Sequence, residues 1–385
     1  MDAYARHNKI WPILQILIRP WLPRKFGYTF DTLDPALTGP VLLIPNHVTA
    51  WDPLLVALSL PRKQIYFVAS EHIFRLGAVT KLLNWLVGPI PRPKASSGVD
   101  TVKQCLRHLR AGHSVCLFAE GEGSWDGVTA PIFPATGKLA RASGATLVTY
   151  RLEGGYLTLP RWGRKVRRGR MHGAPVGVYT PEQLQAMTPQ QVNAAIQRDI
   201  YEDAAARERE TPVPYRCRTA AESLERAIYL CPDCRKIGTL HTKGDNIFCA
   251  CGFSRRYTEY GTFEPSEPFE TVADWDRWQK DRLAEGNFAH DTAPDTPLFS
   301  DDAVSLTRLW SDHRTELIGT GRLDQHPDRL CCAGRDFPLD ALDSMALVRN
   351  HILLLHDREG YYELRGPDGA SMKKYLDYRN TRKER

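Results

Sequence analysis

The chain has 385 residues, enough for two or three domains of ordinary size. Its hydrophobic fraction of 42% and charged fraction of 25% are those of a globular protein, so a fibrous or wholly disordered chain is excluded. The N-terminal apolar stretch from Ile10 to Ile18 is about half as long as a membrane-spanning helix, which argues against a multi-span membrane protein.

The positive charge is concentrated in the first half of the chain. Residues 1–215 carry 26 basic and 16 acidic side chains, a net charge of +10, whereas residues 216–385 carry 25 and 29, a net charge of −4. The first half should therefore attract an anionic partner: a phosphate-bearing substrate, an anionic membrane surface or a nucleic acid. Residues 1–26 combine apolar bulk, basic flanks and two tryptophans, which suits either a membrane-interface segment or a helix packed on its own domain.

Short apolar runs alternate with helix-like segments in the first half of the chain. The runs have the composition of buried strands and lie at residues 40–45, 65–70, 114–120 and 145–152. Helix-like segments separate them, at residues 53–60, 74–87 and 98–112. This alternation predicts a layered α/β domain. Two further helices are expected, from Thr188 to about Glu210 and over 219–229.

His47 directly follows the first apolar run, and Asp52 lies five positions further on. Open α/β sheets build their sites at the carboxyl ends of strands. There, a carboxylate can fix one ring nitrogen of a histidine and leave the other to take a proton from a hydroxyl. The alternative is a structural histidine beside a helix-capping aspartate. His290 and Asp295 share the spacing but lie in a Pro- and Asp-rich segment that would not position a catalytic group.

Two other segments carry candidate binding groups. The loop Glu120–Ser124 closes the third apolar run, and its two glycines permit a tight turn with exposed backbone N–H groups. Arg92 and Lys94 lie in a stiff, Pro-rich segment and could present cations to a phosphate. The alternatives are a plain strand-to-loop turn for the first segment and a solvated basic loop for the second.

Together these segments resemble the motifs of the glycerolipid acyltransferase superfamily, which includes the 1-acylglycerol-3-phosphate acyltransferases. The family motifs are N-H-x4-D, a short segment with an arginine, and F-P-E-G-T-R-S. The matching residues are, in turn, Asn46, His47 and Asp52; Arg92; and Phe118, Glu120, Gly121 and Ser124. Glu122 and Gly123 stand where the family pattern has Thr-Arg, so the third motif lacks its usual cation here.

The resemblance implies a glycerolphosphate acyltransferase-like fold over residues 27–215, with a mixed sheet flanked by helices. It also implies transfer of a fatty acyl group from a thioester donor, acyl-CoA or acyl carrier protein, to a lysophospholipid hydroxyl. The favoured acceptor is 1-acylglycerol-3-phosphate, which gives phosphatidate. His47 would be the general base, oriented by Asp52. The residues implied in substrate binding are Asn46, Arg92, Lys94, Glu120, Gly121 and Ser124.

Four of the nine cysteines lie within residues 231–251, in the spacing C-x2-C-x14-C-x-C. Two tight turns that each supply two thiolates form a closed tetrahedral metal site of the structural type. The segment resembles a zinc ribbon, which we expect over 216–258 with a preceding helix. The expected zinc ligands are Cys231, Cys234, Cys249 and Cys251. The alternatives are iron in a rubredoxin-like site, free cysteines or redox pairs, and Cys217 or His241 as substitute ligands.

The cysteine usage and the lack of a recognisable signal peptide favour a reducing compartment. We therefore expect a cytoplasmic protein, peripheral on the cytoplasmic face of the membrane, with an anionic membrane surface as a partner. The basic run 161–170 lacks the aromatic interleaving of a single-strand binder, so no nucleic-acid partner is expected.

The remaining part of the chain changes character twice. Residues 259–303 are rich in Pro, Asp, Glu and Thr, and we expect a linker that carries one short helix at 272–284. Residues 304–385 alternate short strands with turn residues and end in a basic, helix-like tail. This pattern predicts a β-rich accessory domain that looks like a pleckstrin-homology-type sandwich with a closing helix.

Two other functions stay open on the sequence alone. A serine esterase could use Ser124 as its nucleophile with His47, although Gly121–Gly127 does not give the G-x-S-x-G elbow. A non-enzymatic membrane or nucleic-acid binding module could also be built on a degenerate acyltransferase fold, and it would turn over no acyl donor.

Overall fold

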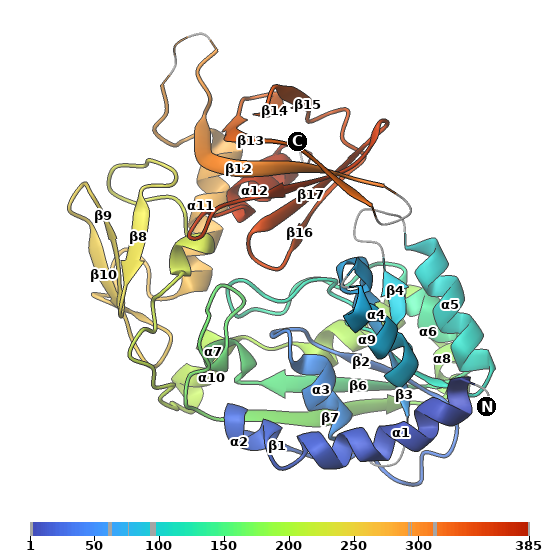
Figure 1. The fold of residues 1–385 in the computed structure, drawn as a ribbon. Helices are drawn as coiled ribbons and strands as arrows, with labels where there is room; N and C mark the ends of the chain where they lie inside the picture. The colour runs from blue at the N-terminus through green and yellow to red at the C-terminus, as the bar shows by residue number, and fades with distance from the viewer. Residues whose placement is uncertain are drawn as a thin grey trace. The chain divides into compact units, whose positions relative to one another are not determined.

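The computed structural model describes residues 3–60, 64–75, 77–92, 98–291, 293, 295–310 and 314–383. The chain forms two compact units. They comprise Met1–Arg161 with Lys165–Arg216, and Trp162–Arg164 with Cys217–Arg385. Each unit has its own β-sheets and its own helices (Figure 1).

The first unit is built on a seven-stranded sheet with the strand order β1-β7-β6-β2-β5-β3-β4. Neighbouring strands are parallel except for β6 and β7, which are antiparallel. The mixed α/β architecture predicted from the sequence is therefore confirmed. The strands are β1 (Tyr28–Phe30), β2 (Val41–Pro45), β3 (Ile65–Ser70), β4 (Ile90–Arg92), β5 (Ser114–Cys116), β6 (Thr146–Glu153) and β7 (Met171–Tyr179).

Strand β2 lies in the middle of this sheet, and all five of its residues are buried. Successive side chains of a strand point to opposite faces. Leu43 accordingly packs in one core with residues of α1, α2 and α3, whereas Leu42 packs in another with residues of α5, α6, α8 and α9. A strand that is apolar on both faces needs helices on both sides of the sheet, and the fold supplies them.

Ten α-helices and one 3-10 helix belong to the part of this unit that the structure describes. They are α1 (Ala3–Ile18), α2 (Leu22–Phe26), α3 (Asp52–Ala57), η1 (Glu71–Arg75), α4 (Ala78–Leu86), α5 (Val99–Arg110), α6 (Thr136–Ala142), α7 (Gly155–Thr158), α8 (Pro181–Ala186), α9 (Pro189–Ile200) and α10 (Ala204–Glu210). No helix in the described ranges is long and apolar enough to cross a membrane.

Two of the expected helices differ from the structure. The helix expected from Thr188 to Glu210 is two helices, α9 and α10, because the Asp203 carboxylate accepts hydrogen bonds from the first backbone N–H groups of α10 and starts a new helix. The helix expected over 219–229, ahead of the cysteines, is absent from these described residues. They form turns and one short 3-10 helix, η2 (Leu224–Arg226).

The second unit contains a small antiparallel sheet and a larger one. The small sheet has the order β11-β10-β9-β8 and holds two of the cysteines at or near its strand ends. Its strands are β8 (Leu240–Lys243), β9 (Asn246–Cys249), β10 (Ser254–Tyr257) and β11 (Phe263–Glu264).

The segment 259–303, expected to be a linker, is folded into this unit. It carries β11, the helix α11 (Val272–Glu285) and the first residues of the larger sheet. Trp275 of α11 is fully buried, and its indole N–H donates to the carbonyl of Leu230 over 3.0 Å. The short helix expected at 272–284 is thus confirmed as α11.

The larger sheet confirms the expected C-terminal β-rich domain. Its order is β15-β14-β13-β12-β18-β17-β16, with antiparallel neighbours throughout. The strands are β12 (Phe299–Leu309), β13 (Thr315–Gln325), β14 (Arg329–Cys332), β15 (Arg335–Pro338), β16 (Ser344–Val348), β17 (Ile352–Asp357) and β18 (Gly360–Arg365). The helix α12 (Lys373–Lys383) follows the last strand.

Helix α12 is joined to α11 by a buried ion pair. The ammonium of Lys373 lies 2.6 Å from a carboxylate oxygen of Asp276 and also contacts Asp377, and these three side chains are almost completely buried. Asp276 also lies 2.6 Å from the ammonium of Lys280, which is 43% exposed, so two carboxylates meet two ammonium groups here. Removing Lys373 would take away the buried cation that both carboxylates share.

Candidate active site and four-cysteine group

His47 lies in the loop between β2 and α3, at the carboxyl end of β2. Its Nδ1 is 2.8 Å from Oδ2 of Asp52, the first residue of α3. The Asp52 carboxylate is fully buried and also accepts hydrogen bonds from the backbone N–H groups of Val48 and Thr49 and from the Thr49 hydroxyl. An acceptor held in this way fixes the proton on Nδ1, so Nε2 is the basic nitrogen of the ring.

The imidazole of His47 is partly open to solvent, with 24% of its side chain exposed. The ring of Phe118, from the third motif, packs against it with ring centroids 4.5 Å apart. The sequence placed His47 and Asp52 in one site, and the structure brings them into direct hydrogen-bond contact. Such an arrangement suits a general base that receives a proton from a bound hydroxyl.

Asn46 and Glu120 hold the loop in place through buried side chains. The amide of Asn46 donates to the carbonyl of Leu152 and accepts from its N–H, over 2.9 and 2.7 Å, which joins the end of β2 to β6. Glu120 accepts from the backbone N–H of His47 over 2.6 Å and from that of Ala130 over 2.7 Å. The polar atoms expected to meet substrate are thus engaged with the backbone, and both residues position His47.

Burial raises the pKa of Glu120 to about 8, and its two backbone N–H donors only partly offset that effect. The carboxyl therefore changes its protonation state at a pH far above that of an exposed glutamate. Because one of its oxygens binds the backbone of His47, this titration acts on the loop that carries the base.

The third motif forms a tight turn against the His47 loop. The N–H of Ser124 donates to the carbonyl of His47 over 3.1 Å. The hydroxyl of Ser124 donates to Asp126 and to the carbonyl of Val128, so it is committed to its own turn. That geometry gives no support to Ser124 as the nucleophile of an esterase, because such a nucleophile must donate to the histidine.

Gly121 is required for close packing at this turn. Its φ is +79°, a conformation that favours glycine, and an added Cβ would lie 2.5 Å from the ring of Phe133 and 3.0 Å from Nη1 of Arg92. Arg92 thus comes from the end of β4 to the third motif, with its guanidinium 4.3 Å from the Phe133 ring centroid. Lys94 lies outside the described residues.

Arg161 is a residue of this site that no motif identified. Its Nη1 lies 2.6 Å from Oε2 of Glu122 and 3.0 Å from the carbonyl oxygen of Gly123. Two features of the sequence pointed toward it: the departure from the motif at Glu122 and Gly123, and the basic run 161–170, which begins at Arg161.

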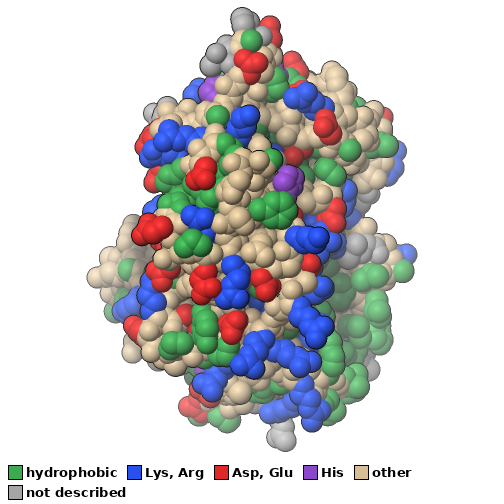
Figure 2. Space-filling model, turned by 90° about the vertical axis from the view of Figure 1, so that its left-hand side faces the viewer, with side chains coloured by type: hydrophobic (Ala, Val, Ile, Leu, Met, Phe, Trp, Pro, Cys, Tyr) green, Lys and Arg blue, Asp and Glu red, His purple; other side chains and the backbone are tan. Residues whose placement is uncertain are grey.

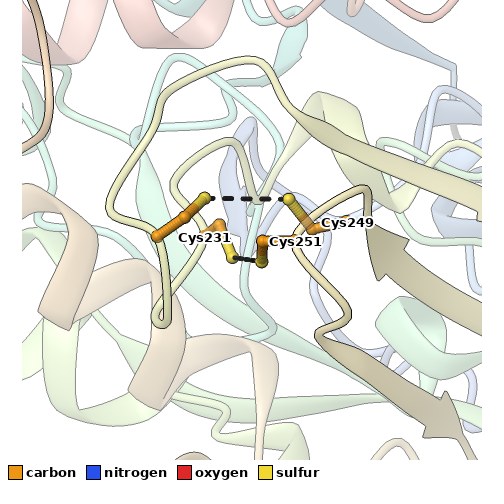
Figure 3. Close-up of side chains that lie close together, drawn as sticks. Cys231, Cys249 and Cys251 are labelled. Carbon is orange, nitrogen blue, oxygen red and sulfur yellow. Dashed lines mark hydrogen bonds between the residues drawn. The ribbon is translucent and has the colours of Figure 1, made fainter.

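The four cysteines of the predicted metal site come together. The sulfur atoms of Cys231, Cys234, Cys249 and Cys251 all lie within 4.8 Å of one another. The sulfur atoms of Cys231 and Cys251 are 3.6 Å apart, and those of Cys234 and Cys249 are 3.8 Å apart. Figure 3 shows the labelled side chains pointing toward a common centre.

These distances fit a metal ion. A tetrahedral zinc site with Zn–S bonds of about 2.3 Å has its sulfur atoms about 3.8 Å apart. Gly252, at a φ of +102°, gives the short second turn a bend that other residues rarely adopt. Cys217 and His241, the substitute ligands considered from the sequence, do not belong to the group that the described residues form.

Comparison with known proteins agrees with the geometry of the first unit. Residues 28–153 match the family model described as Acyltransferase. The chloroplastic 1-acyl-sn-glycerol-3-phosphate acyltransferase BAT2 of Brassica napus is 28% identical over 121 residues, which are 31% of this chain and 35% of that protein. The chloroplastic 1-acyl-sn-glycerol-3-phosphate acyltransferase LPAT1 of Arabidopsis thaliana is 29% identical over 125 residues, 31% and 33% of the two chains.

The chain spans about a third of the length of these curated relatives. The crystal structure of the 1-acyl-sn-glycerophosphate acyltransferase PlsC from Thermotoga maritima has a TM-score of 0.39 and 15% identity, over 50% of this chain and 78% of that one. The strand order described above, and not this weak likeness, establishes the fold. Over residues 28–153, the chain is thus similar to the acyltransferase family and to these 1-acyl-sn-glycerol-3-phosphate acyltransferases.

Proposed function

We propose that the chain transfers a fatty acyl group from a thioester donor, acyl-CoA or acyl carrier protein, to the hydroxyl of a lysophospholipid. The proposed acceptor is 1-acylglycerol-3-phosphate, and the product is phosphatidate. The observation that carries the proposal is the pair of His47 and Asp52, with Nδ1 fixed by a buried carboxylate and the ring partly open to solvent.

In the proposed reaction, Nε2 of His47 takes the proton of the acceptor hydroxyl as the oxygen attacks the thioester carbonyl. The C–S bond then breaks, and the imidazolium returns the proton to the leaving thiolate. Asp52 stabilises the imidazolium, because its carboxylate stays in hydrogen-bond contact with Nδ1. A positioned base of this kind contributes about 10²–10⁴-fold to a rate.

The test measures acyl transfer by the purified protein in detergent or vesicles. Acyl-CoA and acyl carrier protein thioesters would be offered against a panel of lysophospholipids and glycerol-3-phosphate, with products identified by mass spectrometry. His47→Ala should abolish transfer. His290→Ala is the matched control, since His290 has the same spacing to an aspartate but is exposed and contacts the carbonyl of Phe288. Transfer that survives His47→Ala, or no transfer by folded, metal-loaded protein, would overturn the proposal and favour a binding module.

We also propose that the first unit docks peripherally on the cytoplasmic face of a membrane with anionic lipids. Exposed apolar side chains gather on α1 and α4, which meet where Arg6 donates to the carbonyl of Trp85 over 3.0 Å. These exposed residues are Ile13, Ile16 and Leu17 of α1 and Val79, Leu82 and Trp85 of α4. Lys and Arg side chains lie beside hydrophobic ones on the lower part of the face in Figure 2. Apolar and basic groups side by side are typical of an interfacial surface.

Vesicle sedimentation tests the docking proposal. Leu82→Asn should weaken binding to vesicles with anionic lipid about tenfold. Val178→Asn is the matched control, because Val178 is similarly exposed but lies on β7. Equal binding of both variants, or binding that does not depend on anionic lipid, would contradict the proposed surface.

The four-cysteine group is proposed to hold a structural zinc ion. Zinc binding by four thiolates would stabilise the small sheet β8–β11, which has too few buried residues to fold strongly by itself. Elemental analysis of purified protein should find about one zinc per chain, and Cys234→Ser should lower that content. Visible absorbance from bound iron would instead identify a rubredoxin-like site, and metal-free folded protein would exclude both.

A further inference from the structure

The third motif of this chain lacks its usual arginine, yet a guanidinium lies beside it. Arg161, 38 positions after Gly123, donates to Glu122 and to the carbonyl of Gly123. An added Cβ at Gly123 would lie 4.0 Å from Cδ of Arg161, so the arginine stem passes next to the position that the family fills with its own arginine. A cation is therefore present in space although it is missing from the motif.

Arg161 is held firmly in that position. Its side chain is only 10% exposed, and its guanidinium lies 4.4 Å from the ring centroid of Trp125. The Glu122 carboxylate, 2.6 Å from Nη1, orients it further, while Glu122 itself keeps 31% of its side chain exposed. A guanidinium fixed by a carboxylate and an aromatic ring loses little conformational freedom when it binds a ligand.

A second guanidinium belongs to the same turn. Arg92 packs on Phe133 and approaches Gly121, and the negative charge of Glu122 acts on Arg92 as well as on Arg161. The two guanidinium groups therefore lie on either side of the Glu122 carboxylate at this turn. Arginines suit phosphate because their planar donors match its oxygens.

The turn that holds these two arginines is built against the loop that carries His47. The N–H of Ser124 donates to the carbonyl of His47, and an added Cβ at Gly123 would lie 3.2 Å from the carbonyl oxygen of Val48. In 1-acylglycerol-3-phosphate, only two carbons and one ester oxygen separate the free hydroxyl from phosphorus. An acceptor whose hydroxyl meets Nε2 of His47 thus carries its phosphate close to this turn.

We propose that Arg161 is a specificity-determining residue that selects an acceptor bearing a phosphate monoester. The proposal rests on the acyl transfer proposed above. A phosphate monoester carries nearly two negative charges at neutral pH, against one for Glu122, so it competes with that carboxylate for the arginine donors. Glu122 holds Arg161 in position until the phosphate arrives, and Arg92 is the second cation of the subsite.

The first test compares acceptors with and without the phosphate. In Arg161→Gln, the kcat/KM for 1-acylglycerol-3-phosphate should fall about 10- to 100-fold, mainly through KM, because charged hydrogen bonds are lost. The KM for the thioester and the kcat/KM for a neutral monoacylglycerol should stay unchanged. Arg168→Gln is the matched control, since it removes the same charge from an exposed arginine of the same basic run.

A second variant moves the cation instead of removing it. Gly123→Arg in the Arg161→Gln background should restore the preference for the phosphate-bearing acceptor, because the new side chain takes the space that Arg161 leaves. Thermal unfolding of each variant identifies a fold defect. Direct binding of the radiolabelled acceptor to His47→Ala, with and without Arg161→Gln, gives a readout that needs no turnover.

The outcomes separate the two proposals. No transfer by the native protein, with acceptor binding that still depends on Arg161, would overturn the proposed function and leave the phosphate subsite standing. Equal effects of Arg161→Gln and Arg168→Gln, or equal losses with both acceptors, would overturn the subsite and leave the acyl transfer standing.

Discussion

The His47 loop and the four-cysteine group are both built from tight turns, and they differ in what holds their side chains. Around His47 the chain supplies every contact: Asp52 binds the ring, Glu120 binds the backbone, and Phe118 packs on the face of the imidazole. Around the cysteines, backbone hydrogen bonds and the Thr239 hydroxyl hold the two turns, but the four sulfur atoms face one another, and thiolates at such distances repel one another. The geometry of the His47 imidazole is thus a property of the folded chain, whereas the proposed metal ion would be needed to hold four thiolates together.

The largest expected effect tests the His47 side of this contrast. Asp52→Asn keeps the size of the side chain but offers Nδ1 a poorer acceptor and loses the fixed tautomer. We expect kcat to fall about 10²–10⁴-fold, measured as acyl transfer under saturating substrates. Asp295→Asn, the aspartate with the same spacing from His290, should leave kcat unchanged. A loss below tenfold in Asp52→Asn would show that the carboxylate does not orient the base.

Metal removal tests the cysteine side. A chelator that removes the metal should destabilise the small sheet β8–β11 by several kcal/mol, because the free energy of metal binding contributes to the stability of the folded sheet. Hydrogen exchange followed by mass spectrometry should then show faster exchange in β8 and β9, with unchanged exchange in β2. Faster exchange in β2 as well would mean that the metal also supports the first unit, and it would contradict the contrast.

The protonation of Glu120 is expected to make the stability of the His47 loop depend on pH. The folded-state pKa of about 8 lies above the ordinary value of 4.5, so the contribution is fully present below about pH 4.5 and declines as the pH rises to about 8. Glu120→Gln removes this titration. The protection of β2 amides in the native protein, relative to Glu120→Gln, should therefore fall between pH 5 and pH 8.

A relative protection that rises with pH would contradict the raised pKa of Glu120. If the relative protection rises with pH, the two backbone N–H donors outweigh burial and hold Glu120 ionised. His290→Ala, measured in parallel, reports pH effects that do not come from this loop.

The smallest expected effect concerns an ion pair on the surface of the small sheet β8–β11. Arg256 of β10 and Glu264 of β11 form an ion pair, but their side chains are 50% and 60% exposed. Arg256→Gln should change the free energy of unfolding by less than about 0.5 kcal/mol in urea titrations. A large change would indicate that side-chain pairing, and not the ion, holds this sheet.

Local patterns in the sequence predicted much of the site. The spacing of His47 and Asp52 after a buried run was sufficient to predict their contact, because a loop and the first helical turn bring such residues together. The four cysteines were predictable for the same reason, since each pair lies within one turn. These features depend on neighbours in the sequence.

Contacts between distant residues were not predictable. The partner of Asn46 is Leu152, and Arg161 reaches Glu122 from another loop, so only the three-dimensional packing reveals their roles. The helix at 272–284 was predictable, but the packing of its Val272, Trp275 and Leu283 against distant residues was not. The single helix expected from Thr188 to Glu210 is two helices, because Asp203 caps the start of the second one. The polar pattern continues across this position, so it gave no indication of the break.

The ion pair between Lys373 and Asp276 has a consequence for the order of folding during synthesis. Asp276 leaves the ribosome about a hundred residues before Lys373, and until then it has no buried cation from α12 to meet. The second unit can therefore complete its interior only when nearly the whole chain has emerged, whereas every contact of the His47 loop is already available. Nascent chains stalled before Lys373 should accordingly carry a finished first unit followed by a protease-sensitive second unit.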